Sequence, residues 1–151
     1  MIRRFNFEDE IHQSLSCVPM AVRRKLDRIG LKIGLEQWQQ LSRGERLAVC
    51  HLPVESAEEQ DVARLFMQEA VHNRCGGVVK ELPEEMRRSA DPPPTPPAAV
   101  VEHARAAGIT LGQSEWARLD DDERYALIKL GGGAQPSHNL AAALHEFLHH
   151  R

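Results

Sequence analysis

The amino-acid sequence predicts an all-α protein of two similar helical units, each with about three to four helices, packed around one shared core. The first observation is an internal repeat, because residues 19–52 align without a gap with residues 97–130. The second is the spacing of apolar side chains, which recur at helical intervals in both segments. The third is a set of matching helix-start and helix-stop residues in the two segments. Signals for β-strands are weak throughout.

The identical residues of the repeat include the types that usually mark caps, turns and buried anchors. They pair Pro19 with Pro97, Gly30 with Gly108, and Trp38 with Trp116. A gapless match at such positions indicates an internal duplication. We therefore expect residues 1–90 to hold the first repeat and residues 98–151 the second. The Pro-rich residues 91–97 should form a stiff, extended linker between them.

Each repeat is expected to begin with a helix that follows a proline. Gly30 and Gly108 stand where a left-handed C-terminal cap would end that helix. A brief helix carrying the tryptophan comes next. Matching capping boxes at residues 42–45 and 120–123 then open a third helix in each repeat, because each pairs a Ser or Asp with a Glu three positions later.

Two further helices complete the prediction. One begins at a capping box at residues 56–59. Its core-facing side is expected to carry Val62, Leu65, Phe66 and Ala70. The other helix covers residues 137–150, and its apolar stripe should consist of Leu140, Leu144, Phe147 and Leu148. Both tryptophans recur at the same repeat position, so they are expected to be core anchors rather than ligand platforms.

The composition is that of an ordinary globular protein, with 42% hydrophobic and 27% charged residues. A formal net charge of -3 disfavours non-specific binding to nucleic acid. The first residues lack the apolar core of a signal peptide, and no later apolar run is long enough to span a membrane. We therefore expect a soluble cytoplasmic protein without nucleic-acid or membrane partners.

The three cysteines, Cys17, Cys50 and Cys75, form no CxxC pair. An odd number of widely spaced cysteines argues against a disulfide framework, and a zinc knuckle is not expected either. Cys17 lies just ahead of the helix that follows Pro19, where a helix N-terminus could favour a reactive thiolate. A small buried cysteine is the alternative interpretation.

The segment from His145 to His149 matches the HExxH pattern of zinc metalloproteases, with Glu146 in the position of the general base. A metal-dependent hydrolase is therefore one alternative function. Known patterns of this kind take a third ligand further along the chain, and here only His150 and Arg151 remain. We predict no catalytic residue, no metal and no cofactor, with these three residues as the only metal candidates.

Basic residues are concentrated on or just after the helix that follows Pro19, whereas the rest of the chain is acidic. They are Arg23, Arg24, Lys25, Arg28 and Lys32. If Val22, Leu26 and Ile29 face the core, Arg24, Lys25 and Arg28 should lie largely in solvent. This surface could dock an acidic protein partner, be an ordinary solvated face, or, as a second alternative function, bind nucleic acid.

Several segments together resemble one known family. They are Phe5-Asn-Phe-Glu8, Cys17-Val-Pro-Met20, Val22-Arg-Arg-Lys-Leu-Asp27, Gly30-Leu-Lys32, Trp38, Trp116, Ala126-Leu-Ile-Lys-Leu130 and Asn139-Leu with Glu146-Phe147. On these residues the chain resembles the conserved nitrate reductase-associated proteins, small bacterial proteins encoded beside assimilatory nitrate reductase and molybdenum-cofactor genes. Gly131-Gly-Gly133 and the Pro-rich segment depart from that pattern.

The resemblance implies a non-catalytic accessory protein that supports nitrate assimilation by binding a molybdoenzyme such as nitrate reductase, or its maturation machinery. It offers no catalytic residues. The edge at which a partner would dock is expected to comprise Cys17, Pro19, Met20, Arg23, Arg24, Lys25, Asp27, Arg28 and Lys32. For Pro19, Met20 and Asp27, a structural role explains the presence of these residues as well as partner docking does.

Overall fold

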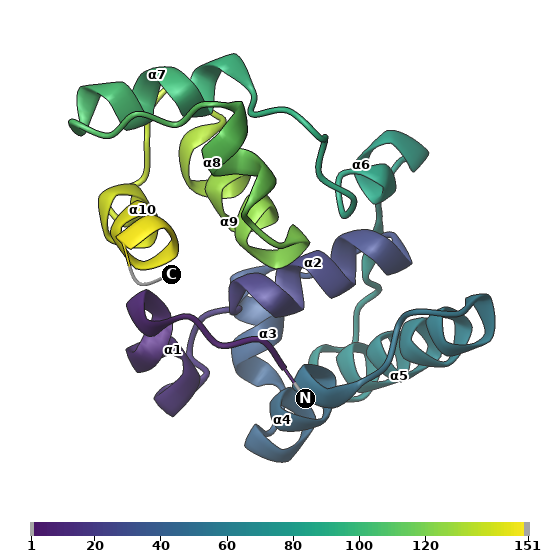
Figure 1. The fold of residues 1–151 in the computed structure, drawn as a ribbon. Coiled ribbons are helices and arrows are strands. Elements are labelled where there is room, and N and C mark those ends of the chain that lie inside the picture. The colour runs from purple at the N-terminus through teal and green to yellow at the C-terminus, as the bar shows by residue number, and fades with distance from the viewer. Residues whose placement is uncertain (1, 150–151) are drawn as a thin grey trace. The chain divides into compact units, whose positions relative to one another are not determined.

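A computed structural model describes residues 2–149, and their secondary structure is almost entirely helical (Figure 1). The predicted all-α class is confirmed. The chain forms two compact units, one of Met1–Arg4 with Glu8–Ala90 and the other of Phe5–Phe7 with Asp91–Arg151. No helix in the described part of the chain is both long and apolar enough to cross a lipid bilayer.

The first unit contains six helices and one two-stranded sheet among the described residues. Its elements are α1 (Asp9–Ser14), α2 (Met20–Ile29), β1 (Leu31–Lys32), α3 (Leu35–Gln40), α4 (Arg43–His51), α5 (Ala57–Cys75), β2 (Lys80–Glu81) and α6 (Glu84–Arg88). A short 3-10 helix, η1 (Asn6–Glu8), precedes them. The core is formed mainly by α2, α3 and α5, and includes Val22, Leu26, Trp38 and Met67.

The second unit consists of α7 (Ala98–Ala106), α8 (Gln113–Ala117), α9 (Asp121–Gly131) and α10 (Leu140–His149). Helices α7, α9 and α10 pack against one another. The predicted stripe of the last helix is largely confirmed, because Leu140, Leu144 and Phe147 are buried and Leu148 is half-buried. The side chain of His103 on α7 lies 2.8 Å from the carbonyl oxygen of Gly131, which ends α9.

The two aligned segments have the same order of helices and the same local features. Gly30 and Gly108 both have positive φ, 76° and 80°, as expected for glycines that end a helix. The indole N–H of Trp38 donates to the carbonyl of Leu15 at 2.8 Å, and that of Trp116 donates to the carbonyl of Pro93 at 3.0 Å. Both tryptophans are fully buried. Superposition of the two segments and one core shared by both units stay predictions.

The predicted capping boxes are present at residues 42–45, 56–59 and 120–123. In each, the Ser or Asp side chain accepts the backbone N–H of the Glu, whose carboxylate accepts the backbone N–H of the cap residue. The repeats differ in one element, since β1 pairs antiparallel with β2 through Leu31 and Glu81. The equivalent residues 109–110 form no strand.

The prediction for the core-facing side of α5 is wrong for two residues. Val62 and Leu65 are 59% and 56% exposed, whereas Ala63, Met67 and Val71 are buried. The helix carries apolar residues on both sides, so its hydrophobic pattern is ambiguous. Small side chains such as Ala63 allow that side of α5 to approach α2 and α3.

Residues 91–97 are not only a connection between the units. The carbonyl of Pro93 accepts the Trp116 indole N–H, and that of Pro94 accepts the side-chain amide of Gln113 at 3.0 Å. The Pro-rich segment is therefore held against α8. Its Pro93 carbonyl accepts the Trp116 indole N–H, and the Leu15 carbonyl in the same way accepts that of Trp38.

Candidate functional site

The predicted docking residues lie on α2 and the loop before it, and most of them make contacts inside the first unit. Pro19 is the N-terminal cap residue of α2 and offers no side-chain acceptor. Glu8 fills that role, because its buried carboxylate accepts the backbone N–H of Met20 at 2.9 Å. A carboxylate is also favoured there by the positive end of the helix dipole. Sequence reasoning missed this role of Glu8.

Lys25 and Arg24 bind backbone carbonyls of other elements. The Lys25 ammonium donates to the carbonyl of Cys50 at 2.6 Å and lies 3.5 Å from that of Val49, both in the last turn of α4. A cation there provides a donor to the Cys50 carbonyl in the last turn and stabilises the negative end of the helix. The Arg24 Nε atom donates to the carbonyl of Ala90 at 2.8 Å.

The other end of α2 binds α6. The Ser89 hydroxyl donates to the Asp27 carboxylate at 3.3 Å. The guanidinium of Arg87 donates to the backbone carbonyl of Arg28 through Nε and Nη2, at 3.4 and 3.3 Å. These contacts favour a structural role for Asp27, one of the two interpretations that the sequence left open.

The expectation that Arg24, Lys25 and Arg28 lie largely in solvent is wrong, since all three are half-buried. The physical reason is that α4, α5 and α6 pack around the short helix α2 and leave little of its surface uncovered. Of the predicted docking residues, Cys17, Arg23 and Lys32 are exposed.

The three free cysteine thiols differ in how deeply they are buried. Cys17 is exposed, Cys75 is half-buried and Cys50 is buried. Burial raises the pKa of the Cys50 thiol, and the nearby Lys25 ammonium opposes that shift. Of the two interpretations of Cys17, the exposed position excludes a buried apolar role.

The last helix places Glu146 against the start of the chain. Its two carboxylate oxygens accept the backbone N–H groups of Asn6 and Phe7, at 3.0 and 3.1 Å. The ring of Phe147 lies 5.0 Å from that of Phe5 and 6.1 Å from that of Phe7, between ring centroids. The N-terminal and C-terminal segments singled out in the sequence therefore meet within the second unit.

This contact gives Glu146 a structural role. His145 and His149 are exposed, and their rings stack with centroids 5.1 Å apart. His150, the remaining histidine after the HExxH segment, lies outside the described residues. Within residues 2–149, no three His, Cys, Asp or Glu side chains are arranged to hold a metal ion.

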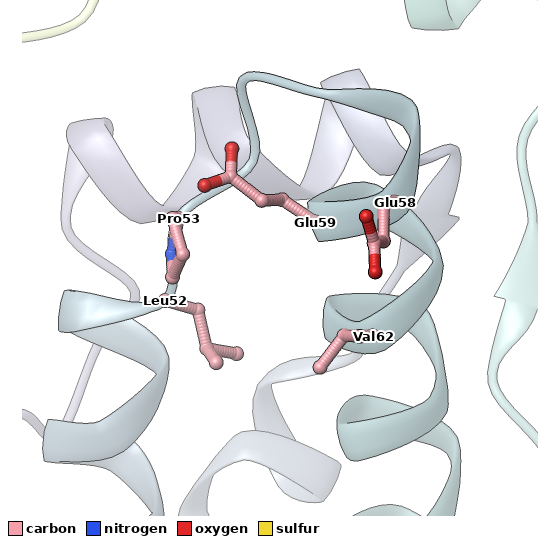
Figure 2. A pocket seen from close by; sticks show the side chains of 5 residues that line it. All are labelled: Leu52, Pro53, Glu58, Glu59 and Val62. Carbon is pink, nitrogen blue, oxygen red and sulfur yellow. The ribbon is translucent and has the colours of Figure 1, made fainter.

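The surface of residues 2–149 includes three hollows that are each lined by residues of one unit. One in the first unit has a volume of about 210 Å³ and is lined by Leu52, Pro53, Glu58, Glu59 and Val62. In Figure 2, Val62 extends from α5 toward Leu52 on the opposite side of this hollow. A second, of about 570 Å³, lies at the other end of α5. The third, in the second unit, is about 360 Å³ and includes Glu115, Arg118 and His149.

In two of these hollows, one carboxylate already has a structural role. Glu59 accepts the backbone N–H groups of Glu55 and Ser56. Glu115 accepts the backbone N–H of Gly112 and the hydroxyl of Ser114, and these hydrogen bonds, that of Ser114 first, lower its pKa. Such carboxylates serve as helix caps, which is a role distinct from acid–base chemistry.

A family model, described as conserved nitrate reductase-associated protein, matches residues 4–147. No curated protein and no solved structure matches the chain. The matched range includes the segment around Glu8, helix α2 and the last helix as far as Phe147.

Proposed function

The chain belongs to the family of conserved nitrate reductase-associated proteins, and we propose that it is a non-catalytic accessory protein of nitrate assimilation. In this proposal it binds a molybdoenzyme such as nitrate reductase, or the machinery that matures it. The observation that carries the proposal is the family match, which spans residues of both units.

The internal roles of the polar residues support a function without catalysis. In the part of the chain that the structure describes, the buried carboxylates of Glu8 and Glu123 accept backbone N–H groups at helix starts. Glu146 accepts two more at the beginning of the chain. Lys25 caps the end of α4. Side chains that could carry acid–base chemistry are thus used to hold helices together.

A cytoplasmic location belongs to the same proposal. Three free cysteines suit a reducing compartment, because oxidising compartments favour disulfide formation. The exposed Arg23 and Lys32 remain available for the predicted contact with an acidic partner. The side chains of Arg24, Lys25 and Asp27 instead hold α2 to its neighbours.

A deletion strain tests the proposal. We expect it to grow more slowly than the parent when nitrate is the nitrogen source, and equally well on ammonium. Nitrate reductase activity in extracts should fall, and the wild-type gene should restore it. Purified tagged protein should also capture purified nitrate reductase or a maturation protein of the molybdoenzyme. Normal growth on nitrate together with unchanged nitrate reductase activity would contradict the proposal.

A further inference from the structure

Helix α5 exposes apolar side chains on the side opposite its core contacts. Val62 and Leu65 are 59% and 56% exposed, and a spacing of three residues places them next to each other on the helix surface. Exposed apolar residues that form a row are typical of binding surfaces, whereas scattered ones are not.

Polar residues on the same side of α5 extend this row in both directions, and a hollow lies at each end. Residues 58, 62, 65, 69 and 72 follow one another at intervals of three or four, so they lie on one side of the helix. The hollow of about 210 Å³ adds Leu52 and Pro53 at one end (Figure 2). The hollow of about 570 Å³ includes Glu69, His72 and the loop residue Val78, which is 87% exposed. We call this surface the α5 face. It consists of Leu52, Pro53 and Val78, together with those residues between 58 and 72 that lie on this side of the helix.

The charge of the α5 face is negative. Glu58, Asp61 and Glu69 are exposed, and within residues 2–149 none of them forms an ion pair. The two arginines of α5 bind elsewhere. Arg64 binds the carbonyl of Ile29 and the carboxylate of Glu81, and Arg74 binds Glu45. Val62 and Leu65 with carboxylates on either side of them along the helix are complementary to a segment that carries apolar and cationic side chains.

We propose that the α5 face docks an amphipathic helix of the partner, with apolar residues on one side and Lys or Arg residues along the edges of that side. The row from residue 58 to residue 72 is about 21 Å long, which matches a helix of about four turns. The two hollows would receive apolar side chains from the ends of that helix, in the manner of helix-in-groove recognition. This inference rests on the proposed function, because it takes from that proposal that the ligand is a protein.

The test uses the full chain and a fluorescent peptide of about 15 leucine and lysine residues, with leucines at helical spacing. We expect anisotropy to show binding that weakens as salt rises from about 50 to about 300 mM. Val62→Ser with Leu65→Ser should raise Kd at least tenfold. The matched control is Leu35→Ser on α3, because Leu35 is 52% exposed, and it should leave Kd unchanged.

A second variant tests charge without changing the apolar row. Glu58→Lys with Glu69→Lys should weaken binding of the lysine peptide and strengthen binding of a peptide with glutamate in place of lysine. Equal peptide binding by wild type and both double variants would overturn the inference, as would no binding by wild type. A wild-type dimer that becomes monomeric in the Val62/Leu65 variant, with no peptide binding, would assign the α5 face to a second copy of this chain instead.

Purified nitrate reductase separates this inference from the proposed function. If nitrate reductase binds wild type and the Val62/Leu65 variant equally, the α5 face is not the docking surface, while the proposed function stands. If the peptide binds in the expected way but the deletion strain assimilates nitrate normally, the α5 face stands and the proposed function fails.

Discussion

The Glu146 carboxylate accepts the backbone N–H group of Asn6 at 3.0 Å, although 140 positions separate the two residues in the sequence. Its second oxygen accepts the N–H group of Phe7, and Phe147 packs on Phe5 and Phe7. One Glu-Phe pair on α10 thereby holds the beginning of the chain. The HExxH match between His145 and His149 contains a glutamate with this structural role.

Replacing Glu146 should therefore affect stability, whereas replacing the histidines beside it should not. Glu146→Ala removes the acceptor of two backbone N–H groups, one exposed and one partly buried, and should lower the free energy of unfolding by about 0.5–1.5 kcal/mol. The double change His145→Gln with His149→Gln removes only exposed side chains and should change it by less than about 0.5 kcal/mol. Urea unfolding measures both.

Growth on nitrate provides a second test of the histidines beside Glu146. We expect the variant with His145, His149 and His150 changed to Gln to support nitrate-dependent growth like wild type. Loss of growth by this variant, with unfolding unchanged, would favour the metal-dependent alternative.

Trp38 and Trp116 should be equally important for the units that contain them. Each is fully buried and donates its indole N–H to a carbonyl 23 residues earlier. Changing either one to Ala should cost about 3–5 kcal/mol, because it leaves a large cavity and removes the indole hydrogen bond. Thermal unfolding followed by circular dichroism tests this. A small effect at one site and a large effect at the other would argue against equivalent repeats.

Lys25 and Arg23 lie two residues apart on α2 but should respond differently to substitution. Lys25→Met removes the cation that caps the last turn of α4 and should lower the free energy of unfolding by about 1–2 kcal/mol. Arg23 is exposed, so Arg23→Met should change it by less than about 0.5 kcal/mol. Chemical denaturation of both variants gives the comparison, and equal losses would show that Lys25 does not act as a cap.

The Glu45 carboxylate should make stability depend on pH in the acid range. The pKa of this carboxyl group is lowered below the usual 4.5, mainly because the group accepts the backbone N–H of Ser42. The hydrogen bond and the charge of Arg74 lower the pKa further. A carboxyl group whose pKa is lower in the folded chain stabilises the fold above its unfolded-state pKa. That contribution is lost as pH falls through the folded-state value.

Glu45→Gln should accordingly be less stable than wild type at pH 7, and the difference should shrink below about pH 4.5. Denaturation at a series of pH values measures it. Glu69→Gln, which removes an exposed carboxylate from the middle of α5, is the matched control and should follow the wild-type pH profile. A constant difference between Glu45→Gln and wild type at all pH values would contradict the assignment.

Local features were predictable from the sequence because their physical causes lie within a few residues. A capping box joins a Ser or Asp to a Glu three positions later, so the starts of α4, α5 and α9 could be assigned without knowledge of the fold. The glycines that end α2 and α7 are defined by a backbone conformation that other residues disfavour.

Tertiary structure decided which side of each helix is covered and which polar groups meet. Apolar residues on both sides of α5 allow two orientations, and packing against α2 and α3 selects the side with Ala63 and Met67. The roles of Lys25 and Glu146 depend on carbonyl and N–H groups that lie 25 and 140 positions away. Sequence spacing carries no information about such pairs, because the free energy of burying or pairing a group depends on the neighbours that the folded chain brings to it.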